Sequence, residues 1–570
     1  MEFDAIVLGT GLSESIAAAA LSKVGYRVAH IDTNAYYGGD QASLTLDELV
    51  EWATLRSREH DASADPSFSY FARQRARYSS IAHSPSIPPQ SRQYSISLAP
   101  SIVPSVGPHI DSLIASGVSR YGSFKLLEKV AVYDRPGYVQ SVPGSKEDVF
   151  KSKVLSLVDK RRLMRFLMFA AGEFEGNKEL EGKEQTPFTD FLREAFSLND
   201  KAATAIVYAL AFCMSCQDPT LPALLRIRQY LRSAGRYGAS PFLVGHYGGL
   251  GETAQGFCRT AAVKGGTYIL GRRIVSISQL PPSDNADPNE TAYPGYSVRL
   301  EDLDELVISK VLVSSPDYLP ESLHSSAGSS PSSESVIARC IAVVDKPLIF
   351  TPMDASEEPS APDAGDDAEE GEESPARAPP DYEVDTALLV FPPGSLDGGS
   401  STSAAHAIVT GEGSMSAPRG KWIVNISLPL SSSSAFTSSA EELIKPYLDA
   451  TLSLTAPPSA DGSAAVPLFT VFYYQHAVND TPSSSTELTG VVLTPPCTQD
   501  LASIADSATQ HAEGMFWTAV GQLKAAGVKR GKVPTGRMAT EEVEEEGQPE
   551  EIDALWPPLD AADEEAMDEF

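Results

Sequence analysis

The stretch from Phe3 to Gly39 has the sequence FDAIVLGTGLSESIAAAALSKVGYRVAHIDTNAYYGG, and its pattern predicts a strand, a tight turn, a helix and a second strand. The apolar run Ala5–Leu8 has the length of a buried parallel strand. Gly9 and Gly11 supply a turn that requires glycine backbone conformations. Asp32 ends the second strand, 21 residues after Gly11, where dinucleotide-binding units place an acid for a ribose hydroxyl.

One position departs from the dinucleotide-binding pattern. The third glycine of G-x-G-x-x-G is replaced by Glu14, although a small residue there lets the helix start lie against the strand. The carboxylate also adds negative charge at a helix N-terminus that would otherwise favour a pyrophosphate. We therefore expect a nucleotide-binding fold without a cofactor, in which Gly9, Gly11 and Asp32 are vestigial. A flavin-dependent oxidoreductase built on the same opening remains an alternative.

The net charge of −32 over 570 residues is concentrated in two stretches. Ten acids and no Lys or Arg lie between Asp354 and Ser374, and 14 acids and no Lys or Arg lie between Glu541 and Phe570. Without these stretches the chain carries −8. Runs of acids are usually solvated, and their sign opposes nucleic-acid binding, so we expect no nucleic acid among the partners.

The five cysteines are too few and too scattered for a disulfide framework. Cys213 and Cys216 form a lone C-x-x-C inside an apolar run, which favours core packing over zinc binding. The sequence shows neither a signal-peptide pattern nor an 18-residue apolar span, and its last residues carry no prenylation cysteine. We expect a reduced, cytosolic protein.

The chain divides into two kinds of pattern. Strand and helix patterns alternate from 1 to 145 and again from 235 to 535, whereas 146–234 is helical almost throughout. We expect an α/β domain I with several sheets, made of 1–145 and 235–535, and an inserted all-helical domain II at 146–234. The acidic stretches 354–381 and 541–570 are expected to be a disordered insert and tail.

Local patterns predict several elements within these domains. Strands are expected over 119–127 and 307–313, and a helix over 255–263. In domain II, one predicted helix has an apolar face formed by residues at i, i+3, i+4 and i+7, namely Leu163, Phe166, Leu167 and Ala170.

Three blocks together resemble the family of Rab GDP-dissociation inhibitors and Rab escort proteins. They are GTGLSES with IDTNAYYGGDQASL at 9–15 and 31–44, RYGASPFLVGHYGGLGETAQGFCRTAAVKGGTYIL at 236–270, and VFKSKVLSLVDKRRLMRFLMF at 149–169. The resemblance covers most of 1–280, and the long second block is its most specific part. The run at 153–161, the chain length and the acidic extensions are closer to the escort proteins than to the compact inhibitors.

The resemblance implies a flavoprotein-like fold that binds no flavin and holds a GDP-bound Rab GTPase on domain I. The implied Rab contacts fall on Tyr37, Glu252, Gln255, Arg259 and Thr267. Glu252 and Arg259 are seven residues apart and could share one helix face, either to meet a partner or to pair with each other. The chain departs from the family at 253–254, where Thr-Ala replaces an apolar residue followed by proline.

Two further roles are implied for domain II. One is a pocket for the geranylgeranyl lipid on Rab, for which Phe166, Ala170, Ala209 and Leu210 are apolar candidates, with ordinary core as the alternative for each. The other is docking onto the Rab geranylgeranyltransferase α/β heterodimer, for which we expect an exposed face with Phe188 and Phe191.

The sequence carries no G-x-S-x-G, G-x-x-x-x-G-K-[ST] or H-E-x-x-H motif. Together with this absence, the resemblance implies a non-catalytic accessory subunit, component A of the prenyltransferase. It would present Rab for cysteine prenylation and deliver the product in transient contact with membranes. A plain Rab GDP-dissociation inhibitor that recycles prenylated Rab is the alternative within the family.

Overall fold

The computed structural model describes residues 1–57, 70–142, 157–281, 293–323, 336–351, 383–430, 438–456, 463–477 and 489–531. Both acidic stretches, 354–381 and 541–570, lie outside these residues, as does the first boundary of the predicted domain II. In the described residues no helix is long and apolar enough to cross a membrane.

A five-stranded parallel sheet forms around the opening segment. Its order is β11 (Thr267–Leu270), β2 (Val28–Asp32), β1 (Ala5–Leu8), β15 (Val311–Ser314) and β23 (Val491–Leu493). Ala5 pairs with Val28 on one side and with Val311 on the other. Since β1 is central, its four residues are buried on both faces, as expected for a parallel strand.

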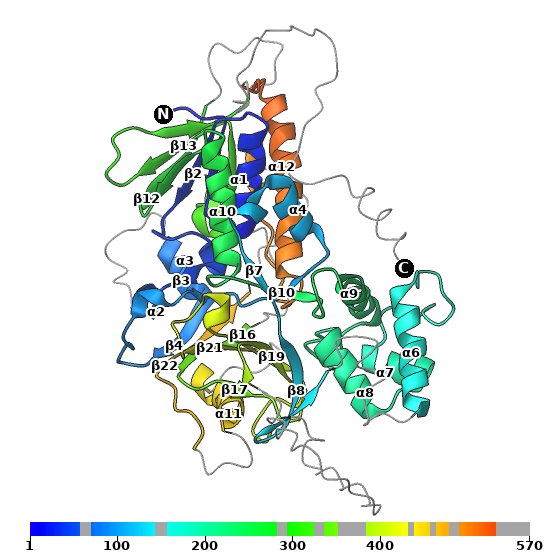
Figure 1. The fold of residues 1–570 in the computed structure, drawn as a ribbon. Helices are drawn as coiled ribbons and strands as arrows, with labels where there is room; N and C mark the ends of the chain where they lie inside the picture. Colours follow the sequence, from blue (N-terminus) through cyan, green and yellow to red (C-terminus); the bar gives the residue numbers. More distant parts are fainter. Residues whose placement is uncertain are drawn as a thin grey trace, which may run out of the picture.

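Helices cover one face of this sheet and a second, small sheet covers the other. Helix α1 (Leu12–Lys23) lies between α10 (Leu250–Val263) and α12 (Ile504–Ala525), and its alanines allow this close approach (Figure 1). The opposite face packs on β12 (Ile274–Leu280), β13 (Gly295–Leu300) and β14 (Val307–Ser309). The strand expected over 307–313 is thus two strands in different sheets, because the chain crosses between layers at Lys310.

An eight-stranded sheet forms the second large layer. Its order is β4 (Tyr78–His83), β22 (Phe469–His476), β16 (Val336–Val344), β21 (Trp422–Leu430), β20 (Ala405–Thr410), β19 (Thr386–Phe391), β8 (Lys129–Arg135) and β9 (Tyr138–Ser141). Helix α11 (Ala440–Ser453) packs on one face. The other face packs on α2 (Leu46–Ser57) at one end and on the helical part at the other (Figure 1).

The helical part comprises α6 (Leu157–Ala171), α7 (Phe188–Phe196), α8 (Asp200–Ala205) and α9 (Thr220–Ser233), with a π-helical turn over Ile206–Leu210. The predicted face of Leu163, Phe166, Leu167 and Ala170 is buried. Cys213 is buried in the same cluster, and the described residues hold no group of side chains that could bind a metal.

Short elements connect these layers. They are α3 (Tyr70–Arg77), α4 (Pro108–Ser116), β3 (Ser43–Leu44), β5 (Ile96–Ser97), β6 (Val103–Pro104), β7 (Phe124–Leu126), β10 (Phe242–Gly245), β17 (Leu348–Ile349) and β18 (Glu383–Val384). The strand expected over 119–127 is wrong in its first half, which forms a 3₁₀ turn over Val118–Arg120 after the left-handed Gly117. The helix expected from 255 begins at Leu250.

Candidate functional site

The acid at the end of β2 is bonded within the protein. Asp32 is buried and accepts hydrogen bonds from the Thr10 amide at 2.8 Å and the Thr10 hydroxyl at 2.6 Å. The Asn34 amide donates at 2.8 Å and the Tyr318 hydroxyl at 2.7 Å. Both carboxylate oxygens therefore bind groups of this chain in the place where a ribose hydroxyl would be recognised.

The glycine turn is covered as well. The ring of Tyr318 lies over Gly9, where a Cβ would meet it at 3.0 Å. The carboxylate of Glu14 folds back to Gly11, where a Cβ would lie 2.5 Å from Oε2. Burial raises the pKa of Glu14 to about 7, against hydrogen bonds from its own backbone and from Thr494. A buried acid thus stands where a phosphate would approach the turn.

These residues do not fit a flavin dinucleotide. The cavity beside Gly9, Gly11 and Glu14 has a volume of about 110 Å³, whereas sites for ligands of drug size have about 300–1,000 Å³. The donors and acceptors that would hold the ribose and the pyrophosphate are already bonded or covered.

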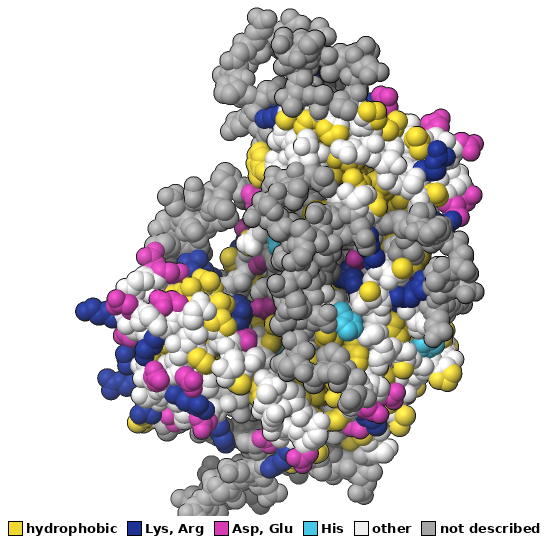
Figure 2. Space-filling view, turned by 180° about the vertical axis from the view of Figure 1, so that it is seen from behind, with side chains coloured by type: hydrophobic (Ala, Val, Ile, Leu, Met, Phe, Trp, Pro, Cys, Tyr) yellow, Lys and Arg dark blue, Asp and Glu magenta, His cyan; other side chains and the backbone are white. Residues whose placement is uncertain are grey.

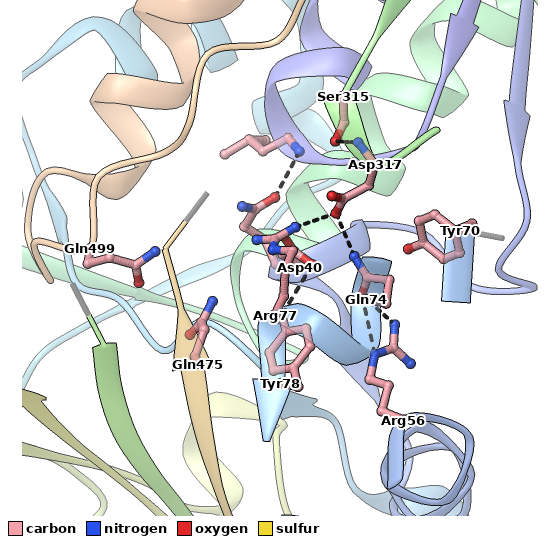
Figure 3. Close-up of polar contacts among 12 residues, drawn as sticks. Asp40, Arg56, Tyr70, Gln74, Arg77, Tyr78, Ser315, Asp317, Gln475 and Gln499 are labelled. Atoms are coloured by element: carbon pink, nitrogen blue, oxygen red, sulfur yellow. Dashed lines mark hydrogen bonds and ion pairs between the residues drawn. The ribbon is translucent and has the colours of Figure 1, made fainter. Parts of the chain in front are cut away.

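A largely buried ionic cluster fixes the turn that follows β2 (Figure 3). Arg77, at the end of α3, contacts Asp40 at 2.5 Å and Asp317 at 2.6 Å. Burial alone would lower the pKa of Arg77, but the two carboxylates raise it well above its usual value. Gln74 also donates to Asp317 at 2.8 Å, and it accepts from Arg56. The segment that carries Tyr37 is therefore tied to α3 and to the loop after β15.

Two glycines bring this turn against the start of α10. Gly38 has a φ of 98°, and a Cβ there would lie 2.8 Å from the Cα of Ala42 and 3.0 Å from the Cα of Gly251. A Cβ on Gly251 would in turn overlap the backbone nitrogen of Ser43. Only glycine allows this backbone contact, which makes the Asn34–Leu44 segment and α10 one continuous surface.

Glu252 and Arg259 lie on the same side of α10 without pairing. Seven residues correspond to about 10.5 Å along a helix, and no ion pair joins the two side chains in the described part of the chain. The guanidinium of Arg259 stacks on the half-exposed ring of Tyr121, 4.5 Å from its centroid. Burial raises the pKa of Glu252, which has no cation within 4.0 Å among the described residues. The internal pairing is thus absent, and both charges are available to a partner.

The other three expected contact residues surround α10. Gln255 is exposed on the helix, and Thr267 begins the edge strand β11 that follows it. Tyr37 is partly exposed, and its ring packs edge-on against Tyr268 with the centroids 6.3 Å apart. The structure therefore places three of these positions on α10, Tyr37 in the turn that contacts it and Thr267 on the strand that follows it. We call these five residues the α10 platform: Tyr37, Glu252, Gln255, Arg259 and Thr267.

The four lipid-pocket candidates share one apolar cluster. Phe166, Ala170, Ala209 and Leu210 are all buried in it. Ala209 and Leu210 lie in the π-helical turn, and Phe212 just beyond it has a φ of 49°, an uncommon value for a residue other than glycine. Irregular backbone therefore adjoins these candidates.

The expected exposure of Phe188 and Phe191 is wrong. Both rings are buried, with the Phe166 and Phe188 centroids 6.2 Å apart and those of Phe191 and Phe196 5.8 Å apart. Helix α7 turns its aromatic face inward and leaves Arg193 and other charged side chains outside. These two side chains consequently present no surface to a docking partner.

The family model described as GDP dissociation inhibitor matches residues 1–75 and 71–358. The chain belongs to this family. It is 33% identical over 326 residues to the Rab proteins geranylgeranyltransferase component A of Candida albicans, covering 57% of this chain and 47% of the relative. It is 29% identical over 419 residues to the Saccharomyces cerevisiae protein of the same name, covering 73% of this chain and 60% of the relative. The matched segments thus span about half to three fifths of these relatives.

Solved structures show the same fold. The Rab GDI of Plasmodium falciparum superposes with a TM-score of 0.58 at 19% identity. The superposition covers 91% of the present chain and 98% of the Plasmodium chain. An oxidoreductase of Methanosarcina mazei superposes with a TM-score of 0.50 at 15% identity, covering 90% and 100%. The flavoprotein-like α/β fold expected from the sequence is confirmed.

Sequence patterns missed three residues of this region. Tyr318, which covers the glycine turn, and Asp317, which pairs with Arg77, lie in a 3₁₀ turn after β15 without a recognisable motif. Tyr121, beneath Arg259, follows another such turn. Because each acts on a residue more than 100 positions away, no local pattern could have indicated its partner.

Proposed function

We propose that this chain is a Rab escort protein, which binds GDP-bound Rab GTPases and presents them to Rab geranylgeranyltransferase without itself catalysing the transfer. The observation that carries the proposal is the α10 platform, where an unpaired carboxylate and an unpaired guanidinium stand on one rigid helix face. The names of the relatives, component A of Rab proteins geranylgeranyltransferase, support a Rab GTPase as the partner of this platform.

The geometry of the platform suits a folded protein partner. An exposed arginine can make paired hydrogen bonds to a carboxylate of the GTPase, and its stacking on Tyr121 holds the guanidinium ready for that contact. The half-buried Glu252 gains from a cation supplied by the partner, because burial without a counter-ion is unfavourable for its charged form. Tyr37 adds a rigid aromatic contact beside them.

For the lipid we propose the apolar cluster of the helical part. A geranylgeranyl chain has no polar groups and requires an apolar lining. The π-helical turn at Ala209 and Leu210 supports this location, since such turns weaken regular helical bonding and recur at functional sites. The helices would part there to admit the chain, so prenylated Rab is expected to bind more tightly than unprenylated Rab.

The platform is tested by titrating GDP-loaded Rab against Arg259→Ala. We expect a loss of about 2 kcal/mol, roughly 30-fold in Kd, as for an interface hot spot. Arg135→Ala is the matched control, because Arg135 also stacks on a tyrosine ring, at 4.6 Å from Tyr138, but lies on β8 away from α10. Equal affinities of the Arg259 variant and the unaltered chain would refute the platform.

The escort role is tested by reconstituting Rab geranylgeranylation with transferase and lipid donor, with and without the chain. We expect prenylation only when the chain is present. A plain GDP dissociation inhibitor is the second candidate, because the family model carries that description. It would extract prenylated Rab from membranes but would neither bind the transferase in the presence of unprenylated Rab nor support the reaction.

A further inference from the structure

Helix α6 exposes an apolar stripe on the side that faces away from the helical core. Leu157, Arg161, Met164 and Met168 recur at i, i+4, i+7 and i+11, so they form one line along the helix, in which Met164 is partly buried against the apolar cluster of the helical part. Leu157 is 85% exposed and Met168 is 72% exposed, while the buried residues of α6 lie on the opposite face. We call this line, with Arg162 and Arg165 beside it, the α6 stripe.

The α6 stripe is basic as well as apolar. Its arginines and methionines line an open groove: Arg161, Arg162, Met164, Arg165 and Met168. Two acids lie beside these arginines, Asp159 at 3.9 Å from Arg162 and Glu179 at 3.5 Å from Arg165, and the Arg165 guanidinium also lies over the Phe196 ring. Arg161 has no acid within 4.0 Å among the described residues. Figure 2 shows Lys and Arg side chains, with Asp and Glu side chains among them, along the outer edge of this helical part.

Such a surface fits a segment that combines acids with a few apolar side chains. The segment 541–570 of this chain has that composition, with 14 acids, no Lys or Arg, and Ile552, Leu555 and Trp556 at i, i+3 and i+4. Glu550, Glu551 and Asp553 flank these three side chains. The apolar spacing matches one helix face, and the charges are opposite to those of the α6 stripe.

The chain that follows Gly531 is long enough for Ile552 to reach the α6 stripe. The last described residue, Gly531, bonds to Gly25 at the end of α1, and 21 residues separate it from Ile552. Twenty-one residues span up to about 70 Å when extended, whereas a compact chain of this size has a radius of gyration of about 25 Å.

We propose that the acidic segment 541–570 docks in cis on the α6 stripe, with Ile552, Leu555 and Trp556 on the apolar line and the flanking acids on Arg161 and Arg165. Tethering gives the segment an effective concentration on the order of 1 mM, so a weak contact suffices to cover the stripe. The segment thereby occupies a face of the helical part until a tighter-binding partner displaces it. This contact does not depend on the Rab-binding proposal.

Methionine oxidation in the full chain tests the contact. Dilute hydrogen peroxide converts exposed methionine to its sulfoxide, and mass spectrometry follows each site separately. Met168 is the probe, and Met415, which is 48% exposed on a different element, is the internal control. The unaltered chain is compared with a chain that ends at residue 540, in dilute solution and at low salt.

We expect Met168 to oxidise at least fivefold more slowly in the full chain than in the shortened chain, with Met415 unchanged. The variant E550Q/E551Q/D553N should lose most of the protection, whereas the matched variant E564Q/E565Q/D568N, which removes the same charge outside the apolar motif, should keep it. High salt should abolish the protection.

Equal oxidation rates of Met168 in the full and shortened chains would overturn the proposal. Protection that persists in the shortened chain and increases with protein concentration would also overturn it, in favour of a second copy on the stripe. Protection that appears only on adding vesicles of anionic lipid would assign the stripe to a membrane surface instead.

Discussion

Replacing Arg77 by methionine should destabilise the protein by about 3 kcal/mol. The guanidinium lies 2.5 Å from Asp40 and 2.6 Å from Asp317, and its removal leaves two acids without a cation in a site that is largely closed to water. Breaking a buried ion pair from one side costs about 3–5 kcal/mol. The lower end applies, since Asp40 is partly accessible and Gln74 still donates to Asp317.

The measurement is urea unfolding followed by circular dichroism, with the free energy of unfolding compared at an unchanged dependence on denaturant. Arg75→Met is the control, because Arg75 lies on the same helix and donates to the Phe71 carbonyl instead. Adding D317N to the Arg77 variant should recover part of the loss, since one of the two stranded charges is then gone. A loss below about 1 kcal/mol, or an equal loss in the Arg75 variant, would refute this account of the cluster.

Three further changes test other parts of the structure. Burial raises the pKa of Glu14 to about 7 in the folded protein, from an ordinary value of 4.5. As the pH rises, the unfolded chain therefore releases the Glu14 proton at a lower pH than the folded protein does. Stability should therefore fall between pH 4.5 and 7 by about 3 kcal/mol from this group, and Glu14→Gln should remove that dependence in urea unfolding at several pH values. Gly251→Ala should weaken both stability and Rab binding, because the added Cβ overlaps the Ser43 backbone. The control Gly514→Ala, in the open part of α12, should instead stabilise the protein by about 0.5–1 kcal/mol. Equal effects of the two substitutions in thermal melts would contradict the tight contact at Gly251. Ser439→Ala removes the capping box of α11 and should cost about 1 kcal/mol by the same melts, with no effect on Rab affinity.

Long periodic segments were predictable because their pattern is local. The strands and helix of the opening segment and the buried face of α6 follow patterns that a single element imposes. Helix α11 is absent from the predicted elements, because Pro446 inside it and the serine-rich sequence before it are unfavourable for a helix. The inward orientation of Phe188 and Phe191 was also missed, because an amphipathic pattern does not say which neighbour covers its apolar face.

The candidate site, like the fold, could be predicted from the sequence only in part. The residue types of the α10 platform could be placed from the sequence through the resemblance, and α10 itself groups Glu252, Gln255 and Arg259. That Arg259 stacks on Tyr121 could not be predicted, since the two residues are 138 positions apart in the sequence. The approach of Tyr37 to α10 likewise depends on a backbone contact between Gly38 and Gly251, which are 213 positions apart.

The sequence alone determined that the opening segment is a dinucleotide-type βαβ unit and that Glu14 is out of place in it, because both follow from residue types at fixed local spacing. Only the tertiary structure decided what replaces the nucleotide. Asp32 is bonded by Thr10, Asn34 and Tyr318, and the ring of Tyr318 covers Gly9 from 309 positions away. Hydrogen bonds and steric contacts act through space and not along the chain, so the closure of this site could be seen only after the distant strand β15 had been placed beside β1.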